Sequence, residues 1–338
     1  MSVHPQTRAE GSRILVAGAD GFVGRHLCKA LARRGCRVVT IDRPGTSSDI
    51  TQDLSDAAFD PDALWNTLGP VDAIVFLAAN ISRTSSVDAV ARRNLRVIAE
   101  APVRLLETAA ARRQRPHLVY CSTFKLYGPA QQPVIDPESH PQRPEPWSYG
   151  SAKALAERLL AIASARAGFT YAVVRPTCIF GPGQHLRNAI PVFLQTAWRG
   201  ESPTVFGSGT SVRDDVFVSD LVEVLAEVAV RRVCGVMHAG GERARTILEV
   251  AQLCCDAVAQ AGGPKDLNPQ CDTSTPPKPW LDQRFDTTST RRQLGYTPTP
   301  IAVGLAAEAA WIRAGARRED AVQDWASPSA PSDGQAQT

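Results

Sequence analysis

Three glycines near the start of the chain, Gly18, Gly21 and Gly24, lie between an apolar segment and an amphipathic one. Residues 13–17 have the profile of a buried parallel strand, and residues 25–33 carry apolar side chains at helical spacing. Glycines at such a turn let the backbone approach a pyrophosphate closely, and the helix N-terminus offers N–H groups to the anion. We therefore predict a dinucleotide site, whose contacts are Gly18, Gly21, Phe22, Val23 and Gly24.

An acidic residue follows the next predicted strand. Residues 37–41 are mostly apolar and end on Asp42, about 20 residues beyond the glycines. A carboxylate at this place can bind the adenosine ribose hydroxyls and repels a 2′-phosphate, which favours NAD over NADP. Arg43 follows directly and keeps NADP as an alternative. We predict that Asp53 and Leu54 contact the adenine, although an aspartate there is equally typical of a loop or a helix N-cap.

Apolar strands alternate with helices through the first half of the chain. Residues 71–79, 117–121 and 171–175 are predicted as further buried strands, and residues 87–113 as a long helix with a kink at Pro102. This alternation predicts a doubly wound α/β fold with a parallel sheet. Ligands of such folds bind beyond the carboxyl ends of the strands. The residues at these ends are Gly18, Asp42, Ala78, Ala79 and Thr123.

A length of 338 residues predicts one large domain or two joined ones. After Pro176 the alternation loosens, as expected for a smaller C-terminal substrate lobe interleaved with the last elements of the sheet. The predicted divisions are a disordered N-terminus (1–11), a dinucleotide-binding domain (12–175), a substrate lobe (176–316) and a disordered tail (317–338).

Caps and loops of the second half are also predicted. A helix over residues 221–230 would be capped by Ser219 or Asp220, and another, capped by Thr246, would run to about residue 259. The proline-rich residues 128–147 are predicted as an irregular loop over the site. Residues 264–283 are predicted as a second covering loop or a disordered segment.

The composition is that of an ordinary globular protein. Apolar residues make up 43% and charged residues 21% of the chain, and the net charge of +3 is spread thinly, so we expect no nucleic-acid and no anionic-membrane partner. No run of 18 apolar residues occurs, and the first ten residues lack the apolar core of a signal peptide. Eight cysteines without Cys-x-x-Cys spacing and six scattered histidines predict free thiols in a reducing cytoplasm and no bound metal.

Tyr149 and Lys153 stand four residues apart at the start of an alanine-rich segment that is predicted to be helical. Residues at this spacing share one helix face, so the phenol and the ammonium point the same way. A cation beside a tyrosine favours the phenolate and lowers its pKa, each unit requiring roughly 1.4 kcal/mol. The pair is therefore a candidate acid/base, although the same spacing also occurs in helix starts without function.

Further motifs accompany this pair. They are Gly-x-x-Gly-x-x-Gly at 18–24, Phe76-Leu-Ala-Ala79, Ser122-Thr123-x-x-x-Tyr127-Gly128, Arg175-Pro-x-x-x-Phe-Gly-Pro-Gly183, Gly207-x-Gly209-x-x-x-Arg213-Asp214 and Arg291-Arg-Gln-Leu-Gly-Tyr296. Together with Tyr149-x-x-x-Lys153 they resemble the extended short-chain dehydrogenase/reductase family, in its NAD-dependent nucleotide-sugar epimerase/dehydratase branch. The matching segments run from about residue 13 to about residue 305. The resemblance implies a Rossmann fold, NAD as cofactor and a nucleotide-sugar substrate.

The resemblance also implies roles for single residues. Thr123 would hydrogen-bond the substrate hydroxyl and Tyr149 would be the acid/base. Lys153 would hold the nicotinamide ribose and lower the pKa of Tyr149. Cys178 stands at a substrate-contacting position, and Arg213 would bind the substrate diphosphate. From the residues alone, Arg213 is also typical of a surface arginine beside two aspartates.

Two more consequences come from the resemblance alone. Pro176 and Ile179, in the loop after the strand over 171–175, would contact the cofactor. A homodimer would form through the helices predicted over residues 87–113 and 149–167.

The chain departs from the family pattern at several positions. Members that dehydrate the sugar carry Asp-Glu directly after the threonine, where this chain has Phe124 and Lys125. No acid/base pair for eliminating water is therefore evident, and decarboxylation is disfavoured as well. The asparagine that usually contacts the sugar nucleotide is replaced by Cys178. A helix asparagine of the family falls at Ile98, with Asn94 one turn earlier as a substitute.

These features favour an NAD-dependent nucleotide-sugar epimerase, with C4 as the predicted centre and a transient 4-keto sugar. An alternative is a net oxidoreductase on the same scaffold, either a 4-keto-sugar reductase or a dehydrogenase. A non-catalytic dinucleotide sensor is the third hypothesis, and the presence of Tyr149 and Lys153 disfavours it.

Overall fold

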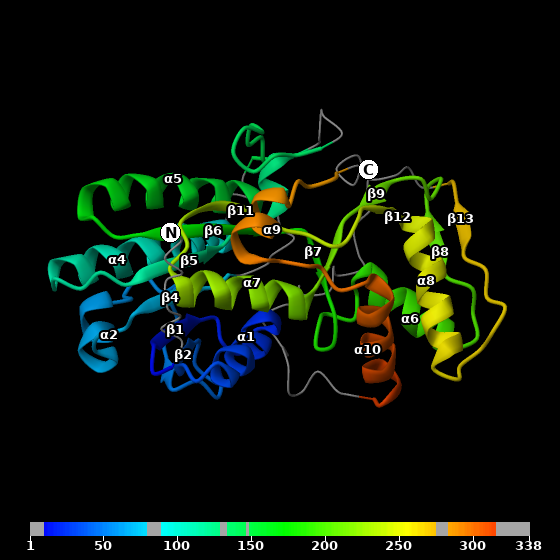
Figure 1. Cartoon of the computed structure of the whole chain (residues 1–338), viewed down its shortest axis with the longest axis horizontal. Helices are drawn as coiled ribbons and strands as arrows, with labels where there is room; N and C mark the ends of the chain where they lie inside the picture. The colour runs from blue at the N-terminus through cyan, green and yellow to red at the C-terminus, as the bar shows by residue number, and fades with distance from the viewer. Residues whose placement is uncertain (1–9, 80–88, 129–133, 147–148, 275–282, 316–338) are drawn as a thin grey trace, which may run out of the picture.

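A seven-stranded parallel sheet forms the centre of the molecule (Figure 1). The computed structural model describes residues 10–79, 89–128, 134–146, 149–274 and 283–315. The strands, in spatial order, are β11 (Gly235–Ala239), β6 (Tyr171–Pro176), β5 (His117–Cys121), β4 (Ala73–Phe76), β1 (Arg13–Ala17), β2 (Arg37–Asp42) and β3 (Ile50–Thr51). The order reverses between β1 and β4, which is where doubly wound folds bind ligands. The predicted fold class is confirmed.

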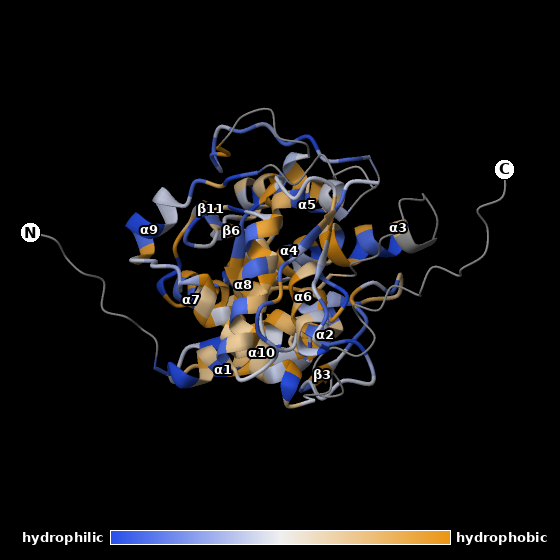
Figure 2. Ribbon diagram, turned by 90° about the vertical axis from the view of Figure 1, so that its right-hand side faces the viewer, coloured by the Kyte–Doolittle hydropathy of each residue, from blue (hydrophilic) through white to orange (hydrophobic). Residues whose placement is uncertain are grey.

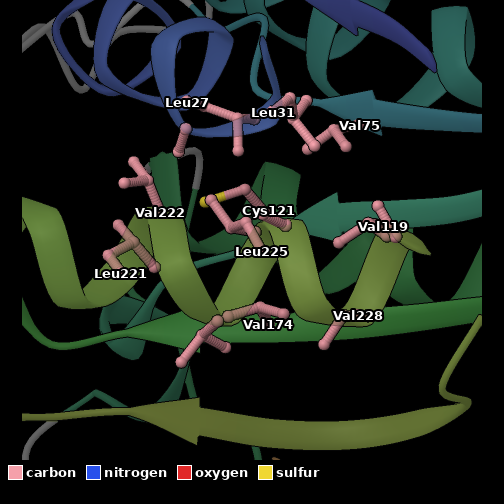
Figure 3. Packing of buried hydrophobic residues seen from close by; sticks show 14 of the residues in the cluster. Leu27, Leu31, Val75, Val119, Cys121, Val174, Leu221, Val222, Leu225 and Val228 are labelled. Atoms are coloured by element: carbon pink, nitrogen blue, oxygen red, sulfur yellow. The ribbon is translucent and has the colours of Figure 1, made fainter. Parts of the chain in front are cut away.

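Helices cover both faces of this sheet because successive side chains of a strand point to opposite faces. In β1, Ile14 and Val16 belong to one core, together with α1 (Phe22–Arg33) and α7 (Val218–Arg231). Leu15 and Ala17 belong to the other core, which is covered by α2 (Pro61–Leu68), α4 (Ala101–Ala111) and α5 (Tyr149–Ala167). Figure 3 shows leucines of α1 and α7 meeting valines of three central strands. Burial on both faces explains why these strands are continuously apolar.

A smaller lobe packs around a third core. Its helices are α6 (Ala189–Trp198), α8 (Ile247–Gln260) and α10 (Ile301–Arg313), which lie together at one end of the sheet (Figure 1). Three short strand pairs accompany them: β7 (Cys178–Phe180) with β10 (Asp215–Phe217), β9 (Val212–Arg213) with β12 (Arg245–Thr246), and β8 (Thr204–Phe206) with β13 (Gln270–Asp272). Strand β11 belongs to the large sheet, α7 packs on that sheet, and α9 (Thr288–Leu294) packs beside β11. The chain therefore passes more than once between the large sheet and the smaller lobe. Hydrophobic residues gather where the helices meet, as Figure 2 shows.

The helix predicted over residues 87–113 is interrupted. Within the described residues it consists of α3 (Ala89–Leu95), a π-helical turn η1 (Arg96–Glu100) and α4. Pro102 lies in the first turn of α4, where its missing N–H removes one hydrogen bond of a regular helix. The predicted break is thus present, but it takes the form of a π turn before the proline.

Other local predictions divide into confirmed and wrong ones. Thr246 caps α8 by accepting a hydrogen bond from the Glu249 N–H at 3.1 Å, as predicted. Neither Ser219 nor Asp220 caps α7, because that helix begins at Val218 and Asp220 accepts hydrogen bonds from Thr299 instead. The strand predicted over 71–79 is shorter than expected, since β4 covers Ala73–Phe76. Residues 264–283, predicted as a loop or disordered segment, contain the strand β13, which pairs with β8 and which the local sequence did not predict.

The predicted disordered ends, residues 1–11 and 317–338, lie almost entirely outside the described residues. Among the residues that are described, no helix is long and apolar enough to cross a membrane.

Candidate active site

The glycine turn after β1 forms a cradle into which side chains would not fit. Gly18 has a φ of +87°, and a Cβ there would lie 2.8 Å from the backbone nitrogen of Ala78. A Cβ on Gly24 would lie 2.2 Å from the carbonyl oxygen of Gly18. The N-cap of α1 is Gly21, which makes no side-chain cap, so the first amides of the helix are not satisfied by a capping side chain. This is the geometry that a pyrophosphate requires.

Asp42 closes this turn at the carboxyl end of β2. Its two carboxylate oxygens accept hydrogen bonds from the N–H groups of Asp20 at 2.9 Å and Arg43 at 2.8 Å. Burial raises the pKa of Asp42. A second carboxylate that the sequence reasoning missed, Asp20, accepts hydrogen bonds from the hydroxyls of Ser47 and Ser48. Two carboxylates therefore border the place where an adenosine ribose is expected, which opposes a 2′-phosphate.

Asp53 and Leu54 lie on the far side of β2, after the short strand β3. Asp53 accepts hydrogen bonds from the N–H and hydroxyl of Ser55 and from the guanidinium of Arg93. Leu54 is buried in the core beneath α4. The carboxylate thus has partners of its own in the chain, and its contact with adenine stays a prediction.

The remaining cofactor candidates lie at or after the carboxyl ends of β4 and β6. Ala78 and Ala79 follow β4 and are half-buried, and the backbone of Ala78 faces Gly18. Pro176 ends β6, where it pairs with Ala239, and Ile179 lies half-buried in β7. The cradle, the carboxylates and these small or apolar residues fit a dinucleotide.

Thr123, Tyr149 and Lys153 come together from two elements. Thr123 follows β5 and caps the 3₁₀ turn η2 (Phe124–Tyr127), its hydroxyl accepting from the Lys125 N–H at 3.3 Å. Tyr149 is the first residue of α5. A Cβ on Gly150 would lie 2.6 Å from the carbonyl oxygen of Lys125, so the start of α5 and the η2 turn are in close contact. This contact brings the threonine and the tyrosine to one place.

Lys153 lies buried beneath this pair. Its Nζ donates a hydrogen bond to the carbonyl oxygen of Cys121 at 2.6 Å and lies 4.4 Å from the ring centre of Tyr120. The distance from Nζ to the ring centre of Tyr149 is 5.7 Å, so both residues share one helix face as predicted.

The electrostatics of the pair differ from the expectation. Burial raises the pKa of Tyr149 above its ordinary value, and burial lowers the pKa of Lys153 to about 8. Loss of solvation thus dominates the pKa of Tyr149 within the chain, and the prediction that Lys153 lowers this pKa stays a prediction. Stabilising the phenolate needs a further positive charge.

Cys178 and Arg213 lie on neighbouring elements of the lobe. Arg213 makes a two-pronged ion pair with Asp215, and its side chain is only 13% exposed. The alternative of a solvated surface arginine is therefore wrong. Cys178 is half-buried in β7, where burial raises the pKa of its thiol to about 11, so that it is neutral at physiological pH.

The residues that depart from the family pattern differ in burial. Phe124 is buried and its ring meets that of Phe285 edge-on at 5.7 Å, whereas Lys125 is exposed. Ile98 is fully buried in η1, so it belongs to the core. Asn94 is buried too, and its amide oxygen has no partner among the described residues. Asn94 thus remains the better candidate for the helix asparagine.

Sequence reasoning also missed a charged residue next to Tyr149 and Lys153. Glu157 lies on α5 one turn beyond Lys153 and is buried against Arg175. The spacing 149, 153 and 157 on one helix face was the signal that pointed to it. Among the described residues, no cluster of three or more histidine, cysteine, aspartate or glutamate side chains is arranged to hold a metal ion.

The fold and the glycine turn define the class as a dinucleotide-dependent enzyme, in which Tyr149 and Lys153 are the candidate acid/base pair. The chain belongs to the NAD dependent epimerase/dehydratase family, whose family model matches residues 14–235. The resemblance, the enzyme class and NAD as cofactor are thereby confirmed.

Known proteins resemble the chain over most of its length. It is 31% identical to a dTDP-glucose 4,6-dehydratase of Streptomyces niveus, over 89% of this chain and 93% of that protein. It is 28% identical to UDP-glucuronic acid decarboxylase 1 of Xenopus tropicalis, over 87% of this chain and 70% of that protein. The crystal structure of a UDP-glucose 4-epimerase from Thermotoga maritima with UDP-glucose shares the fold at a TM-score of 0.76 and 24% identity, covering 90% of this chain and all of that one. Members of this family act on nucleotide sugars by epimerisation, dehydration or decarboxylation, and this chain is such an enzyme.

Proposed function

We propose that the protein is an NAD-dependent nucleotide-sugar epimerase that inverts C4 through a transient 4-keto sugar. One observation carries the proposal: Thr123, Tyr149 and Lys153 are all present, while Phe124 and Lys125 hold the two places next to the threonine. A hydroxyl can therefore be deprotonated and reprotonated, but no carboxylate stands beside the threonine to eliminate water.

The residues divide the reaction among them. Thr123 orients the sugar hydroxyl by a hydrogen bond, and Tyr149 takes its proton as the C–H bond breaks. Bound NAD would supply a positive charge and a hydride acceptor, which would give the same hydride back to the other face of the ketone. Lys153, as an ammonium, stabilises the phenolate before the proton is taken. After the keto sugar has turned over, Tyr149 returns the proton on oxygen and the sugar leaves with the opposite configuration.

The surroundings of Phe124 support the absence of an elimination step. Its ring is buried against Phe285, so the position beside Thr123 is apolar and has no proton to exchange. Lys125 is exposed, whereas a general base that takes a proton from carbon needs a lowered pKa and a site without water. Dehydration, the reaction named for the Streptomyces relative, thus lacks its acid/base residues in this chain.

A net oxidoreductase is the second candidate, and Cys178 favours it. A neutral thiol replaces an amide at the position that contacts the sugar nucleotide in the family, so the sugar is held by fewer hydrogen bonds there. A sugar that is oxidised and then released would give net reduction of NAD. A non-catalytic dinucleotide sensor is the weakest candidate, because it requires neither Tyr149 nor Lys153.

Incubation with a panel of sugar nucleotides tests the proposal. Purified protein is mixed with UDP-glucose, dTDP-glucose, UDP-glucuronate and UDP-N-acetylglucosamine, and proton NMR follows the products, with the Tyr149→Phe variant as blank. We expect one substrate to give its C4 epimer without a lasting change in absorbance at 340 nm. A 4-keto-6-deoxy sugar, a pentose with carbon dioxide, or stoichiometric NADH would each contradict epimerisation and identify the competing reaction.

The assembly and location are further parts of this proposal. Leu155 and Ile162 lie seven residues apart on α5 and are 42% and 56% exposed, an apolar face that a second copy would cover. Light scattering after gel filtration should give twice the chain mass, and Ile162→Lys should reduce it to the monomer. Eight free cysteines support a reducing cytoplasm as the location.

A further inference from the structure

A buried ion pair lies directly behind the catalytic residues. Arg175 of β6 and Glu157 of α5 face each other with side chains only 4% and 7% exposed. The Arg175 Nε donates to Glu157 Oε1 at 3.1 Å, and a second guanidinium nitrogen donates to Oε2. Such two-pronged pairs are the strongest and most directional of charge-assisted hydrogen bonds.

Both charges have additional partners from other elements. Glu157 accepts hydrogen bonds from the hydroxyl of Ser122 and, at 2.9 Å, from the amide of Gln142. Arg175 donates through its remaining nitrogen to the hydroxyl of Tyr127 at 2.6 Å and to the carbonyl oxygen of Pro137 at 2.7 Å. His238 Nδ1 donates to the carbonyl oxygen of Asp286 at 2.9 Å, so the neutral ring accepts at Nε2 from the Tyr127 hydroxyl, 2.6 Å away. The pair therefore connects two strands, α5, the η2 turn and the loop that follows it.

The connection joins the two elements that carry the acid/base residues. Ser122 directly precedes Thr123, and Glu157 lies one helical turn beyond Lys153. Lys153 itself donates to the carbonyl oxygen of Cys121 at 2.6 Å. The hydrogen bond from Lys153 to Cys121 and the one from Ser122 to Glu157 thus fix the end of β5 relative to residues 153–157 of α5.

We propose that Glu157 and Arg175 are positioning residues for the proton transfer. Their ion pair holds Ser122, and with it Thr123, at a fixed distance from the Tyr149–Lys153 face of α5. The carboxylate of Glu157 also keeps the neighbouring Lys153 in its ammonium form. The inference rests on the proposed catalytic roles of Thr123, Tyr149 and Lys153, whichever sugar is the substrate.

The effect of Glu157 on the pKa of Lys153 depends on the other charged groups around the carboxylate. Burial lowers the pKa of Lys153 to about 8, and Cys121 and Glu157 oppose this shift. Burial also raises the pKa of the Cys121 thiol to about 11, so Glu157 is the one of the two that is charged at physiological pH. The groups that face Glu157 from the elements around it are Arg175 of β6, Tyr120 of β5, Tyr127 of η2, Tyr171 at the start of β6, and Lys153 of its own helix. The tyrosines are neutral at physiological pH, so Glu157 and Arg175 are the charged partners that matter.

The test compares pH profiles of the full-length enzyme. Replacing the carboxylate by an amide, Glu157→Gln, should lower kcat by about tenfold or more while KM changes less than about threefold, because the groups that touch substrate remain. The basic limb of the kcat profile should move down by about one pH unit, since an unsupported Lys153 loses its proton earlier.

A second variant separates positioning from folding. Glu157→Gln leaves Arg175 buried without its partner, so the protein could lose stability for that reason alone. The double variant Glu157→Leu/Arg175→Met replaces both charges by apolar groups, which is often neutral for stability. We expect it to fold, by circular dichroism, and to keep the lowered kcat and the shifted profile. Asp220→Asn, which removes a buried carboxylate of α7 that accepts from Thr299, is the control and should leave the profile unshifted.

Two outcomes overturn the inference. One is a folded Glu157→Gln protein with the wild-type pH profile, and the other is recovery of wild-type kcat in the double variant. Failure of the underlying function looks different: Tyr149→Phe would then remain active. An inactive Tyr149→Phe together with an unaffected Glu157→Gln refutes the positioning role alone.

Discussion

At the residue scale, the proposed chemistry depends on one phenol whose surroundings oppose its ionisation. Tyr149 is packed against the core beneath α5, and burial raises its pKa. Lys153 is buried too and has given one hydrogen bond to the Cys121 carbonyl oxygen. A phenolate in this setting forms only with help from neighbouring positive charge, so the proposed acid/base role of Tyr149 requires such a charge beside it.

Removing the Tyr149 hydroxyl tests this residue directly. Tyr149→Phe keeps the ring and its packing but cannot transfer a proton, so kcat should fall roughly 10²–10⁴-fold. The NAD content of the purified protein, measured by native mass spectrometry, should stay at the wild-type level. Full activity of the variant would rule out the acid/base role.

A second prediction at this scale concerns Glu308 of α10, a carboxyl that is fully buried and accepts a hydrogen bond from Gln184 at 2.7 Å. Burial raises its pKa from 4.5 to about 7. Between these two values the folded protein holds a proton that the unfolded chain has released, so stability falls as the pH rises through this window. Glu308→Gln should therefore gain roughly 1–3 kcal/mol over the wild type at pH 8 and little at pH 4.5.

Urea denaturation at the two pH values measures this difference. Glu201→Gln serves as the control, because Glu201 is 59% exposed in a surface ion pair. This substitution should change the free energy of unfolding by a similar small amount at both pH values. An identical pH dependence of Glu308→Gln and the wild type would show that this carboxyl does not titrate in the window.

At the element scale, the close approach of β1, α1 and β4 defines the cofactor cradle. Gly24→Ala would place a Cβ 2.2 Å from the Gly18 carbonyl oxygen and 2.6 Å from that of Ala19. The glycine turn and α1 must then separate, which displaces the amides that face a pyrophosphate. We expect NAD affinity to fall at least about tenfold, a loss of about 1.4 kcal/mol, when measured by isothermal titration.

The matched control for this change is another glycine that lies far from the cradle. Gly262 has a φ of +81°, and a Cβ there meets only a side-chain atom of Arg313 at 3.8 Å. Gly262→Ala should cost local stability through backbone strain while leaving NAD affinity unchanged. Equal affinities of the two variants would show that close packing at Gly24 is not what shapes the site.

At the scale of the whole molecule, cofactor binding should stabilise the fold by mass action. At a concentration of about 100 Kd, NAD adds about 2.7 kcal/mol, which for a chain of this size raises Tm by roughly 5 °C. NADP should raise it far less, because Asp42 and Asp20 oppose a 2′-phosphate. Asp42→Ser should narrow the difference between the two cofactors in thermal melts. Equal stabilisation of the wild type by NAD and NADP would favour the alternative, suggested by Arg43, that the protein also binds NADP.

Much of this protein follows from local sequence. The strands at 13–17, 37–42 and 117–121 agree with the prediction to within a residue. The first and third are buried on both faces, which requires a short, continuous apolar run. The positions of the glycine turn, Asp42, Thr123 and the Tyr149–Lys153 pair were predictable too, whereas their roles stay predictions. Each lies at the end of a strand or on one helix face, where local geometry sets the direction of the side chain.

Only the tertiary structure decided the rest. The ion pair of Glu157 and Arg175 joins residues 18 positions apart through elements packed side by side, and the pairing of β13 with β8 spans still more of the chain. The raised pKa of Tyr149 also depends on tertiary packing. Burial causes it, and the segments that bury Tyr149 are distant from it in the sequence. Local sequence determined which groups this protein brings to the carboxyl edge of its sheet. Packing determined how strongly each of them holds its proton.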